Sequence, residues 1–417
     1  MTDRKFPWGR TLLTGFGFLG ISIIWPVFNQ FIPIILQSGP GDKVPGFGLT
    51  PALALFIMTW DNLINIFIQP WAGQRSDRTW NRFGRRKGWI LLGAPIAALG
   101  FVFIPVAQTV IAMMAAILLT DLGMALFRSP TVAWLGDLFS PAERSKANGV
   151  INFMGGIGGL LAFGVGGLLF DRVGQAAPFV AGSLAMLVAL GTAVYFVREP
   201  DRIEVEEPTQ KTSVLDNFKT VFQATDKSGF YVLLGILFWF TAFNALETGL
   251  SSFAVFTLKI SAGSASLMAA SVTISFILFS IPAGLIAQRI GRRRTIQIGL
   301  TGLTLLFLLG FFIIQNVPTF IGVLVVVGFF WAMVNVNSLP MVYDYGDERK
   351  IGAYTGMYYF ASQLASVIGP TLGGVVVDVL DDQYRWMFIF STVFMALAWL
   401  AMSRVKERNL SEKTGRI

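Results

Sequence analysis

Between two long apolar runs the chain reads Gly73-Gln-Arg-Ser-Asp77-Arg78-Thr-Trp-Asn-Arg82-Phe-Gly84-Arg85-Arg86-Lys87. A shorter version returns about half a chain later as Gly284-Leu-Ile-Ala-Gln288-Arg289-Ile-Gly291-Arg292-Arg293-Arg294. Both copies are basic and punctuated by glycine, and each lies between hydrophobic segments. A loop that is used twice in this way predicts a duplicated bundle of membrane-spanning helices.

The composition extends this prediction to the whole chain. Apolar residues make up 54% of the 417 residues and charged residues only 13%, about half the charged share of a soluble protein. The charges cluster and leave twelve apolar runs, which lie near 11–36, 51–72, 88–108, 110–135, 148–170, 178–197, 229–257, 265–287, 295–315, 319–341, 352–377 and 386–403. Runs of this length match the hydrocarbon core of a bilayer when they are helical.

The absence of water in the bilayer core restricts which secondary structure these runs can form. Unpaired backbone amides in lipid cost several kcal/mol each, so a span must be a helix or belong to a closed barrel. The runs lack the alternation of polar and apolar residues that barrel strands show. The sequence therefore predicts an all-α membrane protein of twelve transmembrane helices, in two six-helix bundles related by a parallel pseudo-two-fold repeat.

Most of the positive charge falls on one side of the predicted membrane. With the N-terminus inside, the inner segments hold 27 of the 32 Lys and Arg, and the outer loops hold only Lys43, Arg172, Lys259 and Arg385. This asymmetry follows the positive-inside rule, and it predicts a multi-pass protein of the cell membrane with both termini in the cytoplasm. The net charge of +8 is therefore expected to meet anionic lipid headgroups and not nucleic acid.

The longest polar stretch divides the chain into similar halves. It predicts a cytoplasmic connector, 199–228, between an N-terminal six-helix bundle, 1–198, and a C-terminal six-helix bundle with a basic cytoplasmic tail, 229–417. The two halves echo each other at an offset of about 210 residues. Six spans are an even number, so both halves share one orientation across the membrane.

Ionisable residues inside the spans are the strongest functional pointer, because a charge at the bilayer centre costs at least roughly 2.5–3.5 kcal/mol. The candidates are Asp61, Asp121, Arg128 and Glu247. The chain has no histidine and no cysteine, so a proton carrier within the membrane must be Asp or Glu. We predict Asp121, Asp61 and Glu247 as the proton or cation coupling residues.

Asp121 and Arg128 are two helical turns apart on one predicted span, so they project from the same face roughly 10 Å apart. A water or a substrate hydroxyl is expected to bridge them. Motion that changes access to Arg128 would then switch the affinity of Asp121 for a proton. The alternative is that each is satisfied structurally by a neighbouring helix.

Two further acids have alternative interpretations. Asp61 shares a helical stripe with Asn65 and Gln69, which is typical of the wall of an aqueous cavity, and its oxygens also suit a hard cation. The alternative is a purely structural role for this stripe. Glu247 is the one acid within a span of the second half. It is expected to face the cavity, unless it lies in water near the outer end of its span.

Uncharged polar side chains at membrane depth favour a polar, neutral substrate, because amides and an aromatic platform suit the hydroxyl groups of a sugar. The predicted substrate-binding residues are Arg128, Trp25, Asn29, Gln30, Asn65, Asn335, Tyr359 and Gln363. The basic loop is expected to gate transport. Its predicted gating residues are Gly73, Asp77, Arg78, Gly84, Arg85 and Arg86, with Asp77 pairing with Arg85 or Arg86 and the contacts clamping the halves together.

The first loop resembles the signature of the major facilitator superfamily. The resemblance rests on Gln69-Pro70, Gly73, Ser76-Asp77-Arg78 and Arg82-Phe83-Gly84-Arg85-Arg86. The long spacing between Arg78 and Gly84 is similar to that of the sucrose–proton symporters, and more broadly of the glycoside–pentoside–hexuronide:cation symporters.

A second stretch carries the same resemblance. It runs from Leu119-Thr120-Asp121-Leu122 through Phe127-Arg128-Ser129-Pro130 to Gly136-Asp137-Leu138, and in the sucrose-carrier pattern the Asp of this span is the implied protonation site. Trp60-Asp61 is instead similar to the melibiose-type sodium symporters. The resemblance therefore leaves H⁺ and Na⁺ open as the coupling ion.

These observations predict a secondary active transporter, with H⁺-coupled symport of a disaccharide or other glycoside by alternating access as the first hypothesis. The alternatives are a Na⁺-coupled sugar symporter, a proton-driven exporter of drugs or metabolites, and a membrane sensor without flux. No nucleotide-binding motif of the Gly-x-x-x-x-Gly-Lys-Ser/Thr type is present, so we expect neither an enzyme nor ATP as the driver. We expect no cofactor and no metal site, and a monomer whose partners are a small-molecule substrate, the coupling ion and membrane lipids.

Overall fold

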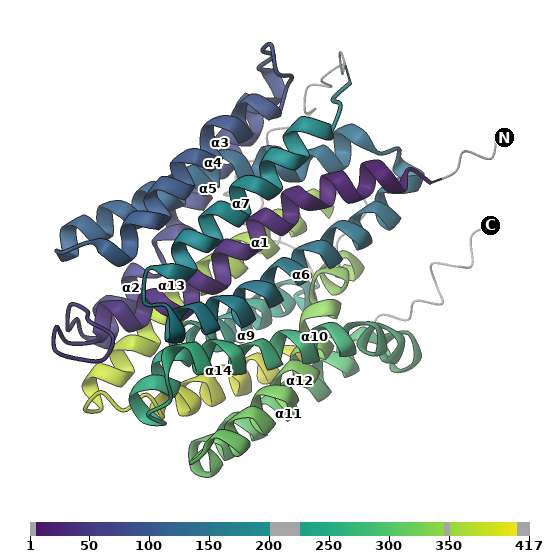
Figure 1. The fold of residues 1–417 in the computed structure, drawn as a ribbon. Helices are drawn as coiled ribbons and strands as arrows, with labels where there is room; N and C mark the ends of the chain where they lie inside the picture. Colours follow the sequence, from purple (N-terminus) through teal and green to yellow (C-terminus); the bar gives the residue numbers. More distant parts are fainter. Residues whose placement is uncertain (1–5, 201–225, 346–350, 407–417) are drawn as a thin grey trace. The chain divides into compact units, whose positions relative to one another are not determined.

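The computed structural model describes residues 6–200, 226–345 and 351–406, and nearly all of these residues are helical (Figure 1). Its α-helices are α1 (Trp8–Gln37), α2 (Pro51–Ile57), α3 (Trp60–Arg78), α4 (Lys87–Phe103), α5 (Val110–Leu138), α6 (Pro141–Arg172), α7 (Ala177–Phe196), α9 (Ser228–Ser252), α10 (Ala262–Ile290), α11 (Arg292–Ile313), α12 (Val317–Tyr345), α13 (Ile351–Val379) and α14 (Trp386–Ser403). A 3₁₀ turn, Ile104–Val106, follows α4, and a π-helical turn, Phe253–Thr257, follows α9. Most of the predicted connector 199–228 and of the basic tail lies outside the described residues.

Twelve segments of the described chain are long and apolar enough to cross a membrane, which confirms the predicted fold class. Large apolar side chains such as Ile111 and Ile281 point outward and are largely exposed, as expected for helices that face lipid. The chain is therefore a multi-pass membrane protein. The pseudo-two-fold relation between the halves stays a prediction.

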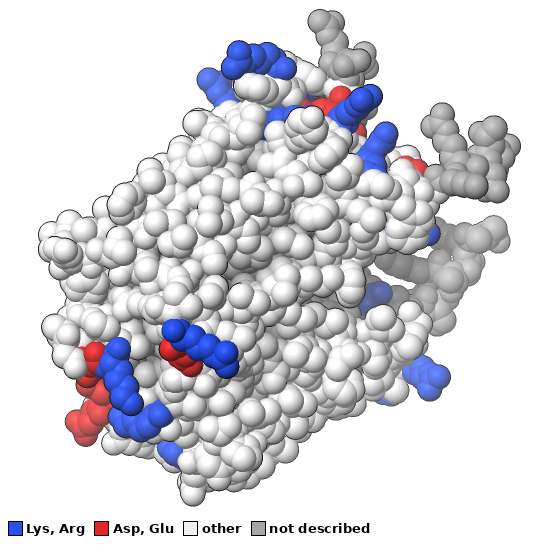
Figure 2. All heavy atoms as spheres, viewed as in Figure 1, with Lys and Arg blue, Asp and Glu red and all other residues white. Residues whose placement is uncertain are grey.

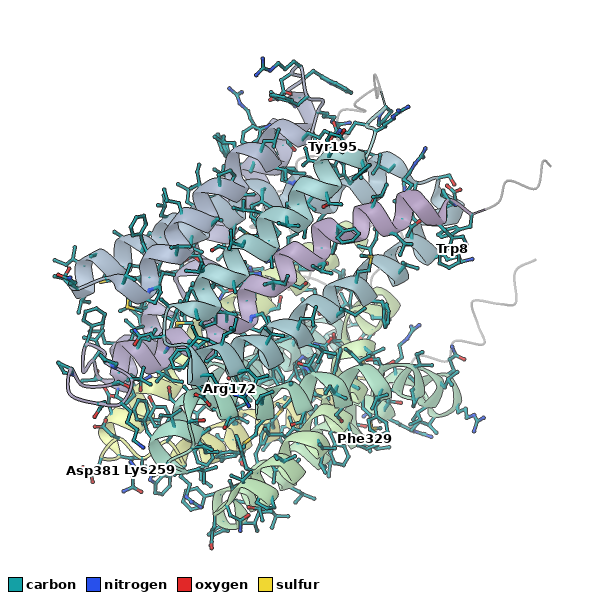
Figure 3. The ribbon with its side chains drawn as sticks, in the orientation of Figure 1. Trp8, Arg172, Tyr195, Lys259, Phe329 and Asp381 are labelled. Atoms are coloured by element: carbon teal, nitrogen blue, oxygen red, sulfur yellow. The ribbon has the colours of Figure 1, made fainter. Side chains whose placement is uncertain are left out.

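Charged and aromatic side chains mark the ends of the helices. On the face drawn in Figure 2 the Lys, Arg, Asp and Glu atoms gather toward helix ends and leave a wide uncharged surface between. Figure 3 places Trp8 and Tyr195 at one end of α1 and α7, and Arg172 at the far end of α6. Both aromatic rings are more than half exposed, which suits the interface between lipid and water.

By the proximity of its Cα atoms the chain divides into two compact units. Unit 1 comprises residues 1–207 and 250–270, and unit 2 comprises residues 208–249 and 271–417. In unit 1, the carboxylate of Asp171 on α6 accepts hydrogen bonds from Ser261 Oγ (2.6 Å) and Gly263 N (2.9 Å), which ties the second segment to the first. The predicted bundle boundaries at 198 and 229 stay a prediction.

Glycines bring α4 and α5 of unit 1 into backbone contact. A Cβ on Gly123 of α5 would meet the backbone of Ala97, and a Cβ on Gly100 of α4 would lie 2.6 Å from the backbone N of Thr120. Helices in lipid associate through such close packing. The contact fixes α5, and with it Asp121 and Arg128, against α4.

The second span is interrupted, where the sequence predicts one continuous helix over 51–72. α2 ends at Ile57 and α3 begins at Trp60. At the break, both the backbone N–H (2.9 Å) and the side-chain Oγ1 (2.7 Å) of Thr59 donate to the carbonyl oxygen of Phe56. The interruption places Asp61 in the first turn of α3.

Candidate functional site

Asp61 lies at the start of a helix inside a membrane span. Its Oδ1 accepts a hydrogen bond from Nδ2 of Asn62 (2.7 Å), and its side chain is half-buried. The N-terminal end of a helix favours negative charge. Interrupted helices in transporters commonly form the site for substrate and ion, so the break at Met58–Thr59 makes this position a candidate site.

Asp121 is the most deeply buried of the predicted coupling residues. The residue is 1% exposed, and within the described part of the chain neither carboxylate oxygen has a hydrogen-bond partner. Buried polar atoms are almost always paired, and an ionised carboxylate without a partner is very costly in a span. A neutral, protonated side chain, or one that exchanges its proton for another partner, resolves this cost.

Asp121 and Arg128 lie two turns apart on α5, and Asp61 lies in the first turn of α3, which packs against α5. The charge of Asp61 acts on Arg128 and on Asp121, and no direct ion pair between Asp121 and Arg128 is found among the described residues. The guanidinium carbon of Arg128 lies 5.9 Å from the ring centroid of Trp25 on α1, within the range of a cation–π contact. We call Asp61, Asp121 and Arg128 the charge cluster of unit 1.

Unpaired amide and indole atoms lie on α1, whose Trp25 contacts Arg128 of the charge cluster, and on α3, which carries Asp61. Trp25 Nε1, Gln30 Oε1 and Asn65 Oδ1 are buried and have no hydrogen-bond partner in the described residues, whereas Asn29 is half-buried. Orphaned buried atoms of this kind call for water or a ligand. The predicted substrate-binding residues of the first half therefore remain candidates.

The predicted residues of the second half lie in unit 2 and are less tightly enclosed. Glu247 on α9 is exposed although it is within a membrane span, and Tyr359 on α13 is 56% exposed. Asn335 and Gln363 are half-buried. No hydrogen bond joins these four side chains to one another in the described chain. Since a carboxylate facing lipid is costly, Glu247 is expected to face water.

Aromatic rings lie beside Glu247 on the same face of α9. Phe243, one turn before Glu247, stacks on Trp331 of α12 with ring centroids 3.8 Å apart and planes 3° from parallel. Phe240 contacts both Trp331 (5.5 Å) and Tyr358 (6.3 Å) edge to face. We call Phe240, Phe243, Trp331 and Tyr358 the aromatic cluster of unit 2.

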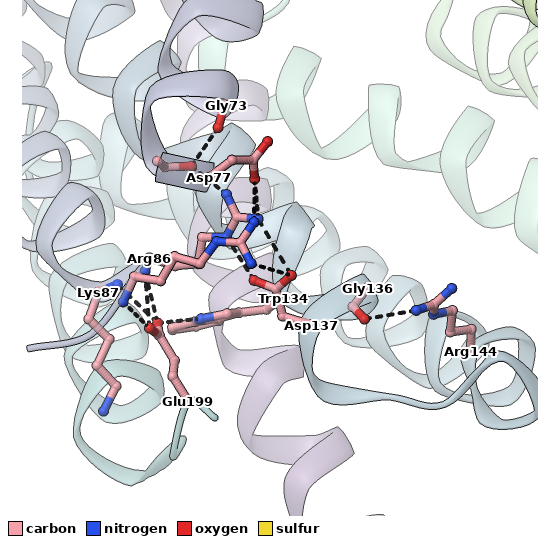
Figure 4. A network of polar contacts seen from close by, with 11 residues as sticks. Gly73, Asp77, Arg86, Lys87, Trp134, Gly136, Asp137, Arg144 and Glu199 are labelled. Carbon is pink, nitrogen blue, oxygen red and sulfur yellow. Dashed lines mark hydrogen bonds and ion pairs between the residues drawn. The ribbon is translucent and has the colours of Figure 1, made fainter. Parts of the chain in front are cut away.

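The loop between α3 and α4 is held by buried ion pairs (Figure 4). Arg85 pairs with Asp77 (2.9 Å), and Arg86 pairs with both Asp77 and Asp137, the latter at 2.8 Å. Arg86 also donates to Ser76. Burial opposes the charge of Arg86, but the hydrogen bond and charge of Asp137 and the charge of Asp77 outweigh it and raise the pKa of Arg86.

The other predicted gating residues have different surroundings. Gly73 lies against α5, where a Cβ would come within 2.6 Å of Ser129 Oγ. Arg78 is exposed and forms no ion pair within the described residues. All the described contacts of the loop network belong to unit 1, so they hold the loop to its own helices. A clamp to the other half stays a prediction.

Sequence reasoning missed Glu199, which follows α7 and completes the network. Its carboxylate accepts hydrogen bonds from the backbone N–H groups of Arg85, Arg86 and Lys87 and from Nε1 of Trp134. The one available signal was its position, three residues after the last residue of a span. That signal says nothing of its partner more than 110 residues earlier.

The second copy of the basic loop works differently in unit 2. Arg293 donates to the carbonyl oxygens of Ser403 (3.0 Å) and Met402 (3.4 Å) at the end of α14. Free carbonyl groups at a helix C-terminus attract cations. The duplicated motif therefore holds a helix end in one unit and an acidic pair in the other.

The sequence of this chain is similar to those of known transporters. The profile of a family described as MFS/sugar transport protein matches residues 44–385. Multidrug resistance protein 2 of Bacillus subtilis (strain 168) is 24% identical over 94% of this chain and 93% of its own length. Proton-associated sugar transporter A of Homo sapiens is 25% identical over 49% of this chain and 29% of its length.

Solved structures share the fold. A crystal structure of the nucleoside transporter NupG superimposes with a TM-score of 0.75 at 15% identity, covering 96% of this chain and 99% of that one. At such identity the likeness concerns the fold alone. The family profile spans most of the chain and carries the assignment. The chain belongs to the MFS/sugar transport protein family and is a membrane transporter, not an enzyme.

Proposed function

We propose that this transporter couples proton movement to the symport of a polar, uncharged substrate of the sugar class by alternating access. It would act in the cell membrane with both termini in the cytoplasm. The main support for this proposal is the charge cluster of unit 1. In this cluster Asp121 is 1% exposed, and its carboxylate oxygens lack hydrogen-bond partners among the described residues. The positive-inside distribution of Lys and Arg supports the orientation.

Proton coupling follows from how the cluster distributes charge. When Asp121 is ionised, the attraction of Arg128 on the same helix favours closing the gap between them. When Asp121 is protonated, that attraction disappears and Arg128 is left to Asp61 and the Trp25 ring. Loading and release of one proton therefore exchange the partners of Arg128, which gives the substrate site two states.

The charge of Arg128 also favours H⁺ over Na⁺. A sodium ion needs several oxygen ligands, and a nearby guanidinium both repels it and competes for the carboxylates. A proton needs one carboxylate oxygen and no coordination shell. Trp25 and the unpaired amides of Gln30 and Asn65 then supply an aromatic face and hydrogen-bonding groups of the kind that suit sugar hydroxyls.

Purified protein in sodium-free proteoliposomes tests the proposal. With an imposed pH gradient, acid outside, we expect a labelled disaccharide to accumulate, and a protonophore to abolish that accumulation because the coupling ion then equilibrates separately. Equal accumulation from a sodium gradient without a pH gradient would assign the coupling to Na⁺. Absence of accumulation for every disaccharide and monosaccharide tested would refute the sugar class.

A second candidate function is proton-driven export of lipophilic cations. It is favoured by the exposed carboxylate of Glu247 beside the stacked rings of Phe243 and Trp331, because a carboxylate and aromatic faces together attract an organic cation. The similarity to the multidrug resistance proteins, which extends over nearly the full length of both chains, supports it.

Replacing Glu247 with Gln separates the two candidates. For a cation exporter we expect the flux of a tetraphenylphosphonium probe to fall about tenfold or more, because the attraction between unit charges about 8 Å apart near a protein surface is worth about 2 kcal/mol. Disaccharide uptake should change little. If E247Q lowers disaccharide accumulation and no cation flux exists in the parent protein, export of cations is rejected and Glu247 serves the sugar site.

A further inference from the structure

One carboxylate holds the entire turn that leads into α4. Glu199 Oε2 lies 2.5 Å from the backbone N of Arg85 and 3.0 Å from that of Arg86, and Oε1 lies 3.0 Å from the backbone N of Lys87 and 2.8 Å from Trp134 Nε1. Four N–H groups therefore converge on a single side chain (Figure 4). Three of them are consecutive backbone donors at a helix start, which have no partner within the helix.

The residues around the Glu199 carboxylate are buried or shaped to make room for it. Trp134 on α5 is completely buried, and Val197, which links α7 to Glu199, is 1% exposed. Gly84 has φ = +122°, and a Cβ at that position would meet Oε2 of Glu199. Glycine is thus needed at residue 84 both for its backbone conformation and for the space that the carboxylate occupies.

The two arginines of the loop are held at both ends. Glu199 binds the backbone of Arg85 and Arg86, while Asp77 and Asp137 bind their guanidinium groups. The side chains of both arginines are nearly buried, so their reach is set by where the backbone lies. Release of the backbone would move both guanidinium groups away from Asp137.

We propose that Glu199 is the positioning residue of the α3–α4 loop. The segment that follows α7 thereby sets the geometry of the Asp77–Arg85–Arg86–Asp137 network. The start of α6 shows the local alternative, a capping box in which Ser140 and Glu143 lie three residues apart in the same turn, whereas Glu199 reaches the start of α4 from more than 110 residues away. The additional bond to Trp134 joins the loop to α5, the helix that carries Asp121 and Arg128. This positioning role of Glu199 does not depend on the identity of the substrate.

A spin label on the loop tests the assignment without a transport assay. The chain has no cysteine, so Trp80→Cys, at an exposed position in the loop, gives one labelling site. In detergent-solubilised full-length protein we expect an immobile label in the W80C parent and a mobile one in the W80C/E199A variant. Gln at residue 199 keeps one acceptor oxygen but presents an NH₂ group to the donors, so W80C/E199Q should be intermediate.

Chemical rescue distinguishes positioning from general destabilisation. Removal of the side chain in E199A leaves the converging N–H groups and a space for a small carboxylate, so added sodium acetate should immobilise the label again, whereas sodium chloride at equal ionic strength should not. The matched control is W80C/E143A, which removes the capping Glu of α6 and should leave the label immobile. Two results would overturn the proposal. The first is a label that stays immobile in W80C/E199A. The second is a label that becomes mobile in both W80C/E199A and W80C/E143A and is not immobilised again by acetate.

Discussion

Asp121→Asn is expected to reduce the accumulation ratio of the transported substrate to about unity, while exchange of substrate across the membrane continues. Asn has the size and neutrality of a protonated Asp, so the helix packing around residue 121 is kept. It cannot release a proton, and without that exchange the pH gradient has no coupling free energy to transmit to the substrate. The measurement is concentrative uptake and counterflow in the same proteoliposomes.

The control for this prediction lies one residue away. Thr120 is also 1% exposed, and its hydroxyl donates to the carbonyl oxygen of Ala116 in its own helix, so Thr120→Val disturbs the same packing without touching a titratable group. We expect T120V to accumulate substrate at close to the parental ratio. Normal accumulation by D121N would remove Asp121 from the coupling mechanism and leave Asp61 and Glu247 as the remaining candidates.

A structural feature can be predicted from the sequence when the residues that determine it lie close together in the chain. Apolar length is a local property, so the spans could be predicted to within a few residues at most ends. The break before Asp61 could not, because Thr59 is compatible with a continuous helix and its bonds to the carbonyl oxygen of Phe56 are visible only in the folded chain. A single side-chain hydrogen bond leaves no periodic trace in the sequence.

The candidate site was predictable as a set of residues but not as an arrangement. Buried charges stand out in an apolar chain, which identified Asp61, Asp121 and Arg128. Helix spacing placed the last two on one face, yet the approach of Asp61 depends on how α3 packs against α5, which the sequence does not encode locally. Glu199 was missed for the same reason, because it binds mainly backbone groups, and any residue type can supply those.

The α3–α4 loop is expected to contribute strongly to stability through Arg86. This side chain is 3% exposed and lies between Asp77, Asp137 and Ser76. Arg86→Met fills a similar volume but leaves Asp137, itself only 13% exposed, without its main partner. We expect the free energy of unfolding to fall by about 3–5 kcal/mol, the usual cost of removing one partner of a buried pair.

Unfolding by SDS titration in mixed micelles measures the change in unfolding free energy. Two further variants test whether that change comes from the unpaired carboxylate of Asp137. Arg78→Met removes an exposed arginine of the same loop and should change the unfolding free energy by only about 0.5 kcal/mol or less. The double variant Arg86→Met/Asp137→Asn should recover part of the loss, because it removes the uncompensated carboxylate charge. If R86M is no less stable than R78M, the network is held by the backbone bonds to Glu199 and not by its ion pairs.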